Sequence, residues 1–216
     1  ARVDTLCLDK TGTLTEGIME VKDYIPINDS DTNMKNILSN IAKFSEDENS
    51  TINAIKDYFK DVTNEFVPVK KYAFSSKNKW SAITFENQGS YIIGAPEFIL
   101  KNNFKKYENT INKYTKDYRV LVLAHTQSKI EKENLPLDTD IIGLLLITDK
   151  IRKEAKDTLE YFYKQDVNIK IISGDNPITV SKIAKQVGVK NYDKYIDMSK
   201  ITDKDSILDI ATNYTV

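Results

Sequence analysis

Apolar residues in the first half of the chain recur at helical spacing in two neighbouring stretches, residues 33–44 and 50–58. In the first stretch, Ile37, Ile41 and Phe44 fall three or four positions apart, which places them on one stripe of a helix. The second stretch repeats this spacing. The pattern therefore predicts two amphipathic helices that follow each other as a helical hairpin.

Runs rich in β-branched and aromatic residues follow this hairpin and predict strands. These runs are residues 70–74, 80–85, 90–93, 120–124 and 141–147. Asn87, Gln88 and Gly89 have the residue types of a tight hairpin turn, and Pro96 opens a further short helix. Because strands joined by tight turns pair antiparallel, we expect an antiparallel sheet with helices packed on it, which is α+β in class.

The two flanks of this region show a different pattern, typical of α/β proteins. Residues 3–8 predict a short buried strand, residues 152–165 an amphipathic helix and residues 167–172 a second buried strand. A further helix then ends at Gly188. Since the α/β pattern stops and later resumes, we expect one domain inserted in another. The expected domain boundaries are residues 1–16 and 149–216 for the α/β domain, with residues 17–148 as the insert.

The composition is that of an ordinary globular domain. Of the 216 residues, 40% are hydrophobic and 29% are charged. The chain has 31 basic and 32 acidic residues, for a formal net charge of −1. Nothing in this balance points to an anionic polymer, so we expect no nucleic-acid partner.

Three single features narrow the class further. Cys7, the only cysteine, lies in the first predicted buried strand, which excludes an internal disulfide and fits a reducing compartment. His125, the only histidine, cannot form a site alone, and we interpret it as structural. The run Ile141–Ile147 is the longest apolar one, and it is far shorter than the about 20 residues that a membrane helix needs. We expect neither a membrane span nor a signal peptide within these residues.

Candidate chemistry begins at Asp9, which ends the first predicted strand. It is followed by a tight turn that carries the hydroxyl groups of Thr11, Thr13 and Thr15. Gly12 lets the backbone reverse so that amides and hydroxyls can surround the carboxylate. In open α/β sheets, ligands bind beyond the carboxyl ends of strands. We interpret Asp9 as a nucleophile that accepts a phosphoryl group, with Lys10 supplying nearby positive charge.

The string Asp-Lys-Thr-Gly-Thr-Leu-Thr at residues 9–15 resembles the phosphorylation signature of the P-type ATPases, which belong to the haloacid dehalogenase superfamily. The resemblance implies that Asp9 takes the terminal phosphate of ATP on a Rossmann-like core. It also implies that the main-chain carbonyl of Thr11 and the Asp9 carboxylate bind Mg²⁺, while the Thr11 hydroxyl holds phosphoryl oxygens. Phosphatases of the superfamily have an aspartate at the position of Thr11, so threonine there implies a long-lived aspartyl phosphate.

Two further turns resemble motifs of the same family. Ser173, Gly174 and Asp175 begin a stretch similar to the family's TGDN turn, in which the hydroxyl and the glycine amide donate to a phosphate oxygen. Asp149 and Arg152 are the outer residues of a stretch similar to the DPPR hinge, here without either proline. A capped helix start with a surface charge is the alternative interpretation of that second match.

The insert resembles the family's nucleotide-binding domain. Phe74 and Lys79 lie in a stretch similar to its adenine-binding segment, which implies stacking of the ring on the base and a lysine beside the nucleotide. Gly94 matches the KGAPE motif, although Ile93 replaces the lysine of that motif. A solvated strand edge is the alternative for the first stretch, and we expect Trp80 to serve packing.

Two other positions complete the implied nucleotide site. Arg119 matches the arginine that bridges nucleotide phosphates in the family. Glu48 and Asn49 both stand where relatives place a group that accepts a hydrogen bond from the adenine amino group, and helix N-capping is the alternative for them.

The resemblance implies the cytoplasmic portion of a membrane pump that uses ATP and Mg²⁺. Its implied partners are the transported cation and the membrane and actuator domains of the same polypeptide. The family's second Mg²⁺-binding aspartate is not among these residues, so little turnover is expected of this chain alone. The transported ion is not encoded here, although the lack of paired-histidine or cysteine-rich motifs disfavours a heavy-metal pump. The alternatives are a soluble dehalogenase-superfamily phosphatase with a large cap domain and a non-catalytic nucleotide-binding module.

Overall fold

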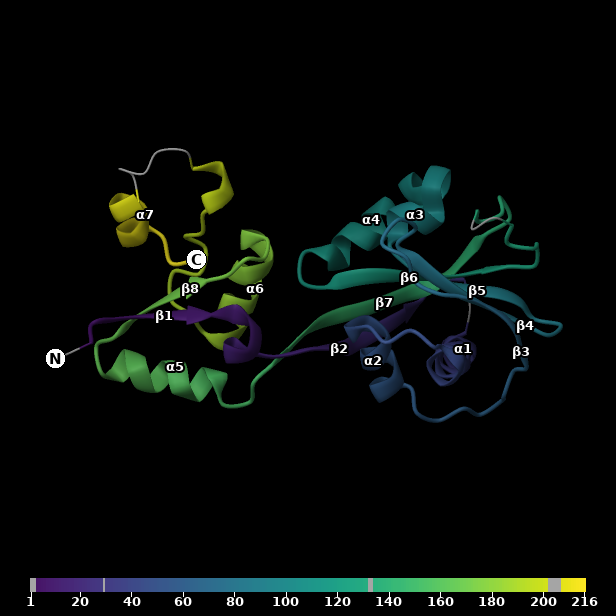
Figure 1. Ribbon diagram of the computed structural model, residues 1–216, viewed down its shortest axis with the longest axis horizontal. Coiled ribbons are helices and arrows are strands. Elements are labelled where there is room, and N and C mark those ends of the chain that lie inside the picture. Colours follow the sequence, from purple (N-terminus) through teal and green to yellow (C-terminus); the bar gives the residue numbers. More distant parts are fainter. Residues whose placement is uncertain (1–2, 29, 132–133, 202–206) are drawn as a thin grey trace. The chain divides into compact units, whose positions relative to one another are not determined.

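The computed structural model describes residues 3–28, 30–131, 134–201 and 207–216. It divides into two compact units, Ala1–Ile18 with Asp149–Val216 and Met19–Thr148 (Figure 1). The chain passes from the first unit to the second within strand β2, Thr15–Pro26, and returns within strand β7, Asp140–Ile151. We refer to them as the flanking unit and the inserted unit.

The inserted unit contains a six-stranded sheet in the order β2-β7-β6-β5-β4-β3. Its remaining strands are β3 (Pro68–Tyr72), β4 (Trp80–Phe85), β5 (Gly89–Gly94) and β6 (Arg119–Thr126). Neighbours from β3 through β7 pair antiparallel, as predicted. The β4–β5 hairpin closes at Asn87 and Gly89, whose φ angles of 57° and 75° are the left-handed values that favour these residue types.

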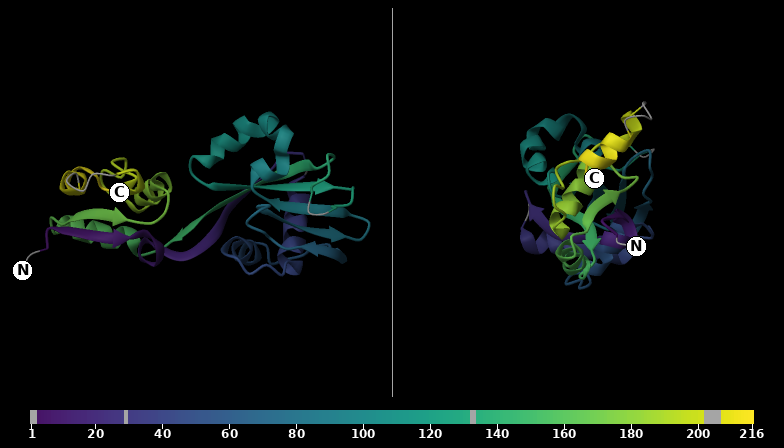
Figure 2. Two further views of the ribbon diagram at one scale, coloured as in Figure 1. Left: turned by 45° about the horizontal axis from the view of Figure 1, so that its top comes forward. Right: turned by 90° about the vertical axis from the view of Figure 1, so that its left-hand side faces the viewer.

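Helices cover both faces of this sheet because its strands alternate apolar side chains between them. Helices α1 (Asp31–Phe44) and α2 (Ser50–Tyr58) share one core cluster with Tyr91 and Ile93. Helices α3 (Pro96–Leu100) and α4 (Phe104–Thr115), joined by the short η2 (Lys101–Asn103), share the other cluster with Ile92. Figure 2 shows α4 on the opposite side of the sheet from α1. Successive residues of β5 thus point to opposite cores.

The flanking unit has an α/β arrangement. Strand β1 (Thr5–Asp9) pairs in parallel with β8 (Asn168–Ile172), and Asp9 lies opposite Ile172. The packed helices are α5 (Ala155–Lys164) and α6 (Pro177–Val187), and the latter ends in a left-handed Gly188 as predicted. The turn η1 (Lys10–Leu14), η3 (Met198–Lys200) and helix α7 (Ile207–Asn213) complete the unit. The mixed α/β and α+β class is confirmed.

The prediction that the first strand is buried, with Cys7 inside it, is wrong. Cys7 is exposed, and along β1 partly covered residues alternate with exposed ones. Leu6 and Leu8 pack against the core of the unit, whereas Cys7 faces away and lines a hollow of about 650 Å³. The apolar residues of this strand are enough to predict a strand but do not show that only one of its faces is covered.

Element boundaries also differ from the predictions. Strand β3 ends at Tyr72, two residues before the predicted end, so Phe74 lies in the following loop. Helix α5 begins at Ala155, so Arg152 precedes it. Strand β2 and helices α4 and α7 are elements that the sequence pattern does not predict. In the described residues, no helix is long and apolar enough to cross a membrane.

Candidate functional site

The turn after β1 presents the Asp9 carboxylate at the carboxyl end of the strand. The carboxylate accepts a hydrogen bond from the backbone N–H of Lys10 at 2.7 Å. The turn closes when the N–H of Thr15 donates to the Lys10 carbonyl, and Gly12 adopts a φ of 79° within it. Asp9 and Thr11 are both exposed. A carboxylate that is anchored from one side and open to solvent on the other is accessible to a ligand.

The side chain of Lys10 joins the ends of three strands. It is only 5% exposed, and its ammonium lies 2.6 Å from the Asp175 carboxylate and 3.2 Å from that of Asp149. Burial disfavours its charge, but the hydrogen bonds and charges of the two aspartates outweigh burial and raise the pKa of Lys10. The two carboxylates that hold the ammonium come from the motifs at β7 and β8, so Lys10 fixes these two segments to the turn of Asp9.

Arg152 supports the same turn from outside. Its Nε and Nη2 atoms donate to the Gly12 carbonyl at 3.1 and 2.8 Å. Its backbone N–H donates to the Leu14 carbonyl at 3.0 Å. A guanidinium donates two hydrogen bonds in a fixed fork, which holds the backbone of the glycine turn in one geometry.

The turn after β8 is ordered by its own side chains. The Ser173 hydroxyl oxygen accepts from the N–H of Asp175 at 3.2 Å, and Asn176 caps α6 by accepting from the N–H of Ile178. Because β1 and β8 are parallel neighbours, this turn and that of Asp9 lie at the same edge of the sheet. A Cβ atom added at Gly174 would meet no heavy atom within 4 Å, so the surroundings of this glycine are open.

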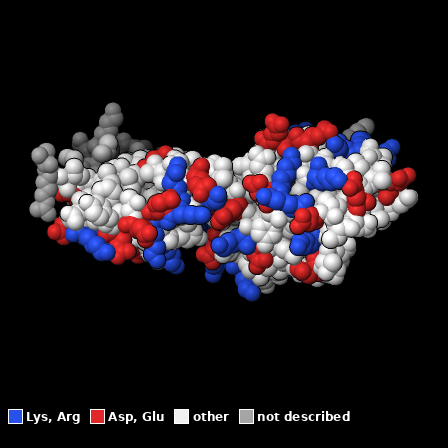
Figure 3. Space-filling view, turned by 90° about the horizontal axis from the view of Figure 1, so that it is seen from below, with Lys and Arg blue, Asp and Glu red and all other residues white. Residues whose placement is uncertain are grey.

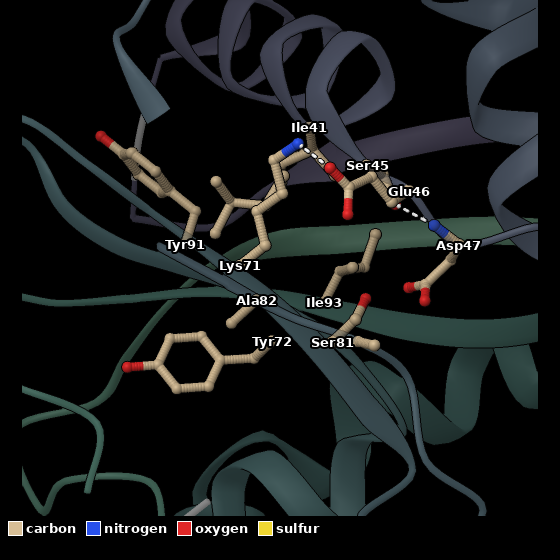
Figure 4. Close-up of a pocket in the computed structure, with 12 residues that line it drawn as sticks. Ile41, Ser45, Glu46, Asp47, Lys71, Tyr72, Ser81, Ala82, Tyr91 and Ile93 are labelled. Carbon is tan, nitrogen blue, oxygen red and sulfur yellow. Dashed lines mark hydrogen bonds and ion pairs between the residues drawn. The ribbon is translucent and has the colours of Figure 1, made fainter. Parts of the chain in front are cut away.

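A cavity of about 100 Å³ lies in the inserted unit between the α1–α2 connection and the β3–β4–β5 strands (Figure 4). It is lined by Ile41, Ser45, Glu46, Asp47, Lys71, Tyr72, Ala73, Ser81, Ala82, Ile83, Tyr91 and Ile93. Lys71 and Glu46 form an ion pair of 2.6 Å, and the N–H of Asp47 donates to the Ser45 hydroxyl oxygen. Pockets for drug-sized ligands typically measure ~300–1,000 Å³, so this one suits a ring and not a whole nucleotide.

Phe74 and Lys79 lie in the loop that leads from β3 to β4. The Phe74 side chain is 42% exposed, and its N–H donates to the Asp47 carboxylate at 3.1 Å, which ties it to the rim of the cavity. Lys79 is exposed and left-handed, with a φ of 58°. Its carbonyl accepts from the N–H of Ala95. Trp80 is buried against Tyr72, so its packing role is confirmed.

Gly94 lies where a side chain would collide with neighbouring backbone atoms. A Cβ atom there would lie 2.4 Å from the Lys79 carbonyl oxygen and 2.5 Å from the Cα of Trp80. Only glycine allows β5 to approach the Lys79 backbone this closely. The residue is buried and does not line the cavity, so its geometry supports the Lys79 segment.

The other predicted nucleotide contacts do not line the cavity. The Asn49 side chain caps α2 by accepting from the N–H of Ile52 at 3.0 Å, which is the helix-capping alternative. Glu48 is exposed. Arg119 begins β6 and places its guanidinium 3.8 Å from the Met19 sulfur. The acidic residues that do line the cavity are Glu46 and Asp47, which precede the two predicted positions in the chain.

Comparison with known families decides the class of the molecule. Residues 3–208 match the model of the haloacid dehalogenase-like hydrolases. The chain belongs to this family. Three of the predicted site residues, Asp9, Lys10 and Asp175, lie at or just after the carboxyl ends of strands β1 and β8 of this hydrolase.

Curated relatives of this hydrolase are cation-transporting ATPases. It is 41% identical over 210 residues to "Probable cation-transporting ATPase exp7" of Streptococcus pneumoniae serotype 4, a match that covers 95% of this chain and 26% of the relative. It is 29% identical over 218 residues to "Calcium-transporting ATPase CtpE" of Mycobacterium bovis, covering 100% of this chain and 27% of the relative. The chain thus spans about a quarter of the length of these relatives.

The fold of this dehalogenase-like hydrolase also occurs in a solved transport ATPase. A crystal structure of a zinc-transporting PIB-type ATPase in its E2.Pi state matches with a TM-score of 0.69 and 18% identity. The match covers 87% of this chain and 28% of that one. At this identity the likeness shows the fold alone.

The turn of Asp9 presents oxygen atoms of a kind that could hold Mg²⁺. Its carboxylate and the main-chain carbonyl of Thr11 are oxygen ligands of the type that Mg²⁺ prefers. Among the described residues, no three His, Cys, Asp or Glu side chains are grouped to hold a metal ion. Mg²⁺ usually keeps several waters and is held by one or two carboxylates together with substrate phosphates. The residues present fit that mode of binding.

Sequence reasoning missed Glu46, Asp47, Lys71 and Tyr91 as cavity residues. The alternation of side chains along each strand could have identified the residues that share a face. Lys71 lies opposite Ile83, and Ile83 lies opposite Tyr91, so the three share one face of the sheet. The run of acidic residues from Glu46 is visible in the sequence, but which of them faces the cavity depends on where α2 begins.

Proposed function

We propose that this chain is the nucleotide-binding and phosphorylation region of a cation-transporting ATPase. The observation that carries the proposal is the turn of Asp9: an exposed carboxylate, anchored by the N–H of Lys10, whose neighbouring strand ends are joined by the buried Lys10 ammonium. The whole protein would couple ATP hydrolysis to movement of a cation across a membrane, with this region on the cytoplasmic face and membrane and actuator domains as its partners.

In this proposal, a carboxylate oxygen of Asp9 attacks the terminal phosphorus of ATP. An oxygen–phosphorus bond forms at Asp9, the bond to the bridging oxygen breaks, and ADP leaves with the electron pair. Mg²⁺, when bound at Asp9 and Thr11, offsets negative charge on the phosphoryl group. Thr11 supplies no carboxylate to activate water, so the aspartyl phosphate persists until another step of the cycle hydrolyses it.

In the inserted unit, the cavity beside Phe74 would hold the base, while Lys79 and Arg119 carry charges suited to the phosphates. Ser173 and Gly174 offer a hydroxyl and a backbone N–H to a phosphate oxygen at the edge of the flanking unit. ATP held in the insert must meet Asp9 for transfer, so the cycle requires domain closure.

The test is phosphorylation of the intact transport protein by ATP labelled at the terminal phosphate. We expect an acid-stable, hydroxylamine-sensitive label with Mg²⁺ present, and Asp9→Asn should lower it by at least about 100-fold because the nucleophile is gone. Asp23→Asn, at an exposed position on β2, is the matched control and should leave the label unchanged.

Other outcomes would favour the alternatives. ATP binding without any acyl phosphate in the intact protein would favour a non-catalytic nucleotide-binding module. Release of phosphate from small phosphate esters by this chain, without ATP binding, would favour a soluble phosphatase with a large cap domain.

A further inference from the structure

Helix α4 covers the sheet of the inserted unit with one face and presents the other face to solvent (Figure 2). Its buried residues, Tyr107 and Ile111, belong to the core on that side of the sheet. Because each residue of a helix turns by about 100°, positions two away from these point to nearly the opposite side. The exposed residues on that outward side recur at spacings of three or four. We call them the basic strip: Lys105, Asn109, Asn112, Lys113 and Lys116.

The charge of the basic strip is not neutralised within the inserted unit. None of its three lysines forms an ion pair with a carboxylate of the described residues. Residues 101–116 hold five lysines and a single acidic residue, Glu108, although the whole chain has a net charge of −1. The Lys113 ammonium lies 5.3 Å from the ring centroid of Tyr114, a contact that leaves its charge in place. The strip is therefore a local excess of positive charge that faces solvent.

Helix α5 of the flanking unit shows the contrasting arrangement. It carries two lysines, one aspartate and one glutamate, and Lys164 pairs with Glu160 one turn earlier at 3.0 Å. Opposite charges at this spacing satisfy each other on the helix itself. In α4, the positions four residues from the strip lysines are held by Asn109 and Asn112, which are neutral. The lysines of α4 are thus left available for acidic groups of another molecule.

The residue types of the basic strip distinguish between classes of anionic partner. Helices that bind at a membrane surface insert apolar residues into the lipid, but the apolar face of α4 is buried against the sheet. Surfaces that hold single-stranded nucleic acid stack bases on aromatic side chains, and the strip has none. A carboxylate accepts hydrogen bonds both from a lysine ammonium and from an asparagine amide. A strip that combines the two donors therefore suits a row of carboxylates.

We propose that the outward face of α4 is a docking surface for an acidic segment of a partner protein, whose carboxylates bind Lys105, Lys113 and Lys116. At 1.5 Å per residue, the strip is about 16 Å long. An extended segment of about five residues spans the same length. The strip includes none of the residues assigned to nucleotide or phosphoryl groups, so the inference goes beyond the proposed function and does not depend on it.

The test measures the binding of a fluorescently labelled ten-residue glutamate peptide to this chain by fluorescence anisotropy. Exposed contacts between lysine and carboxylate are individually weak and are screened by salt. We therefore expect binding at low ionic strength that weakens at least about five-fold between about 20 and about 200 mM salt. The triple variant Lys105→Gln, Lys113→Gln and Lys116→Gln should weaken it at least about 10-fold, because three of the contacts are lost together.

The matched control removes the same amount of charge from dispersed positions of the same unit. Lys22→Gln, Lys35→Gln and Lys129→Gln alter exposed lysines on β2, on α1 and in the β6–β7 connection. Because the two triple variants have the same net charge, a difference between them reports where the charges lie. The control should bind the peptide within about two-fold of wild type. Both variants should keep the thermal unfolding midpoint and the ATP affinity of wild type, since all six side chains are exposed.

Three results would overturn the inference. The first is an equal loss of peptide binding in the two triple variants, and the second is wild-type binding no tighter than that of a ten-residue glutamine peptide. The third is binding of phosphatidylserine vesicles or of single-stranded DNA, lost in the α4 variant, without binding of the glutamate peptide. A wild-type chain that binds the glutamate peptide through α4 but not ATP would refute nucleotide binding and leave this inference standing.

Discussion

The two regions of interest each contain a lysine held by carboxylates, and the two lysines differ in burial. Lys10 of the flanking unit is 5% exposed and contacts two aspartates, whereas Lys71 of the inserted unit is 35% exposed and contacts one glutamate. A buried ammonium without its partners is costly, whereas an exposed one is solvated. The comparison separates a buried ion cluster that holds strand ends together from a solvent-exposed ion pair at the edge of a sheet.

Removing the buried ammonium should have the largest effect on stability. Lys10→Met leaves Asp149 and Asp175 close together without their shared cation, and loss of one partner of a buried pair costs roughly 3–5 kcal/mol. Because Asp175 is 50% exposed, we expect about 2–3 kcal/mol here. Denaturant unfolding of the flanking unit measures the change.

The matched variants are Lys71→Met and Lys164→Met, the latter of which breaks an exposed pair with Glu160 on α5. Each should change the unfolding free energy by no more than about 0.5 kcal/mol. An equal effect of Lys10→Met and Lys71→Met would remove the distinction between the two lysines.

The two regions also differ in how tightly their glycines are packed. Gly94→Ala places a Cβ 2.4 Å from the Lys79 carbonyl oxygen, a backbone atom that cannot move alone. Overpacking of this kind costs ~1–3 kcal/mol, and displacement of the Lys79 segment should weaken ATP binding. Thermal unfolding and calorimetry measure the two effects.

Gly174→Ala is the counterpart in the flanking unit, where nothing lies within 4 Å of the added atom. It should change stability by less than about 0.5 kcal/mol. Wild-type stability in Gly94→Ala would show that the β5 backbone can retreat, contrary to the close approach seen here.

The smallest effect is the pH dependence of the Lys10 cluster. The aspartates raise the pKa of Lys10 above its ordinary value of 10.5. The stability that the ammonium contributes is therefore fully present below pH 10.5 and is lost as the pH rises through the higher pKa of the folded state. The stability difference between wild type and Lys10→Met should shrink in that alkaline range, which unfolding at a series of pH values detects. A difference that stays constant there would mean that the ammonium is not the source of the stabilisation.

The overall distribution of surface charge does not distinguish the two regions, whereas the individual ion pairs do. On the face in Figure 3, basic and acidic side chains are interleaved, in keeping with the near-zero net charge. The two lysines differ in which carboxylates they contact, and composition cannot provide that information.

Strongly patterned elements could be predicted, and weakly patterned ones could not. The spacing of Ile37, Ile41 and Phe44 identified α1, and the residue types at 87–89 identified the β4–β5 turn. Helix α4 was missed because it buries only Tyr107 and Ile111 among many polar residues. Strand β2 was missed because its single buried apolar residue, Val21, does not define an alternation.

The sequence suggests candidate site turns where their residues are neighbours in the chain. The turns at Asp9 and Ser173 each close through contacts within a few residues, so a local motif is enough to predict these turns. The pair of Lys71 with Glu46 joins residues 25 positions apart, and the contact of Lys10 with Asp149 spans 139 positions. No local pattern specifies such a pairing.

The sequence by itself indicated the family, because several of its motifs resemble those of the P-type ATPases. It also indicated the fold class and the expected nucleophile, because these depend on the periodicity of apolar residues and on local turn chemistry. Only the tertiary structure decided which face of β1 is covered, that the Lys10 ammonium meets Asp149 and Asp175, and that Lys71 and Glu46 border the cavity. The physical reason is that burial and ion pairing depend on distances through space, and these are established when strands far apart in the chain come together in one sheet.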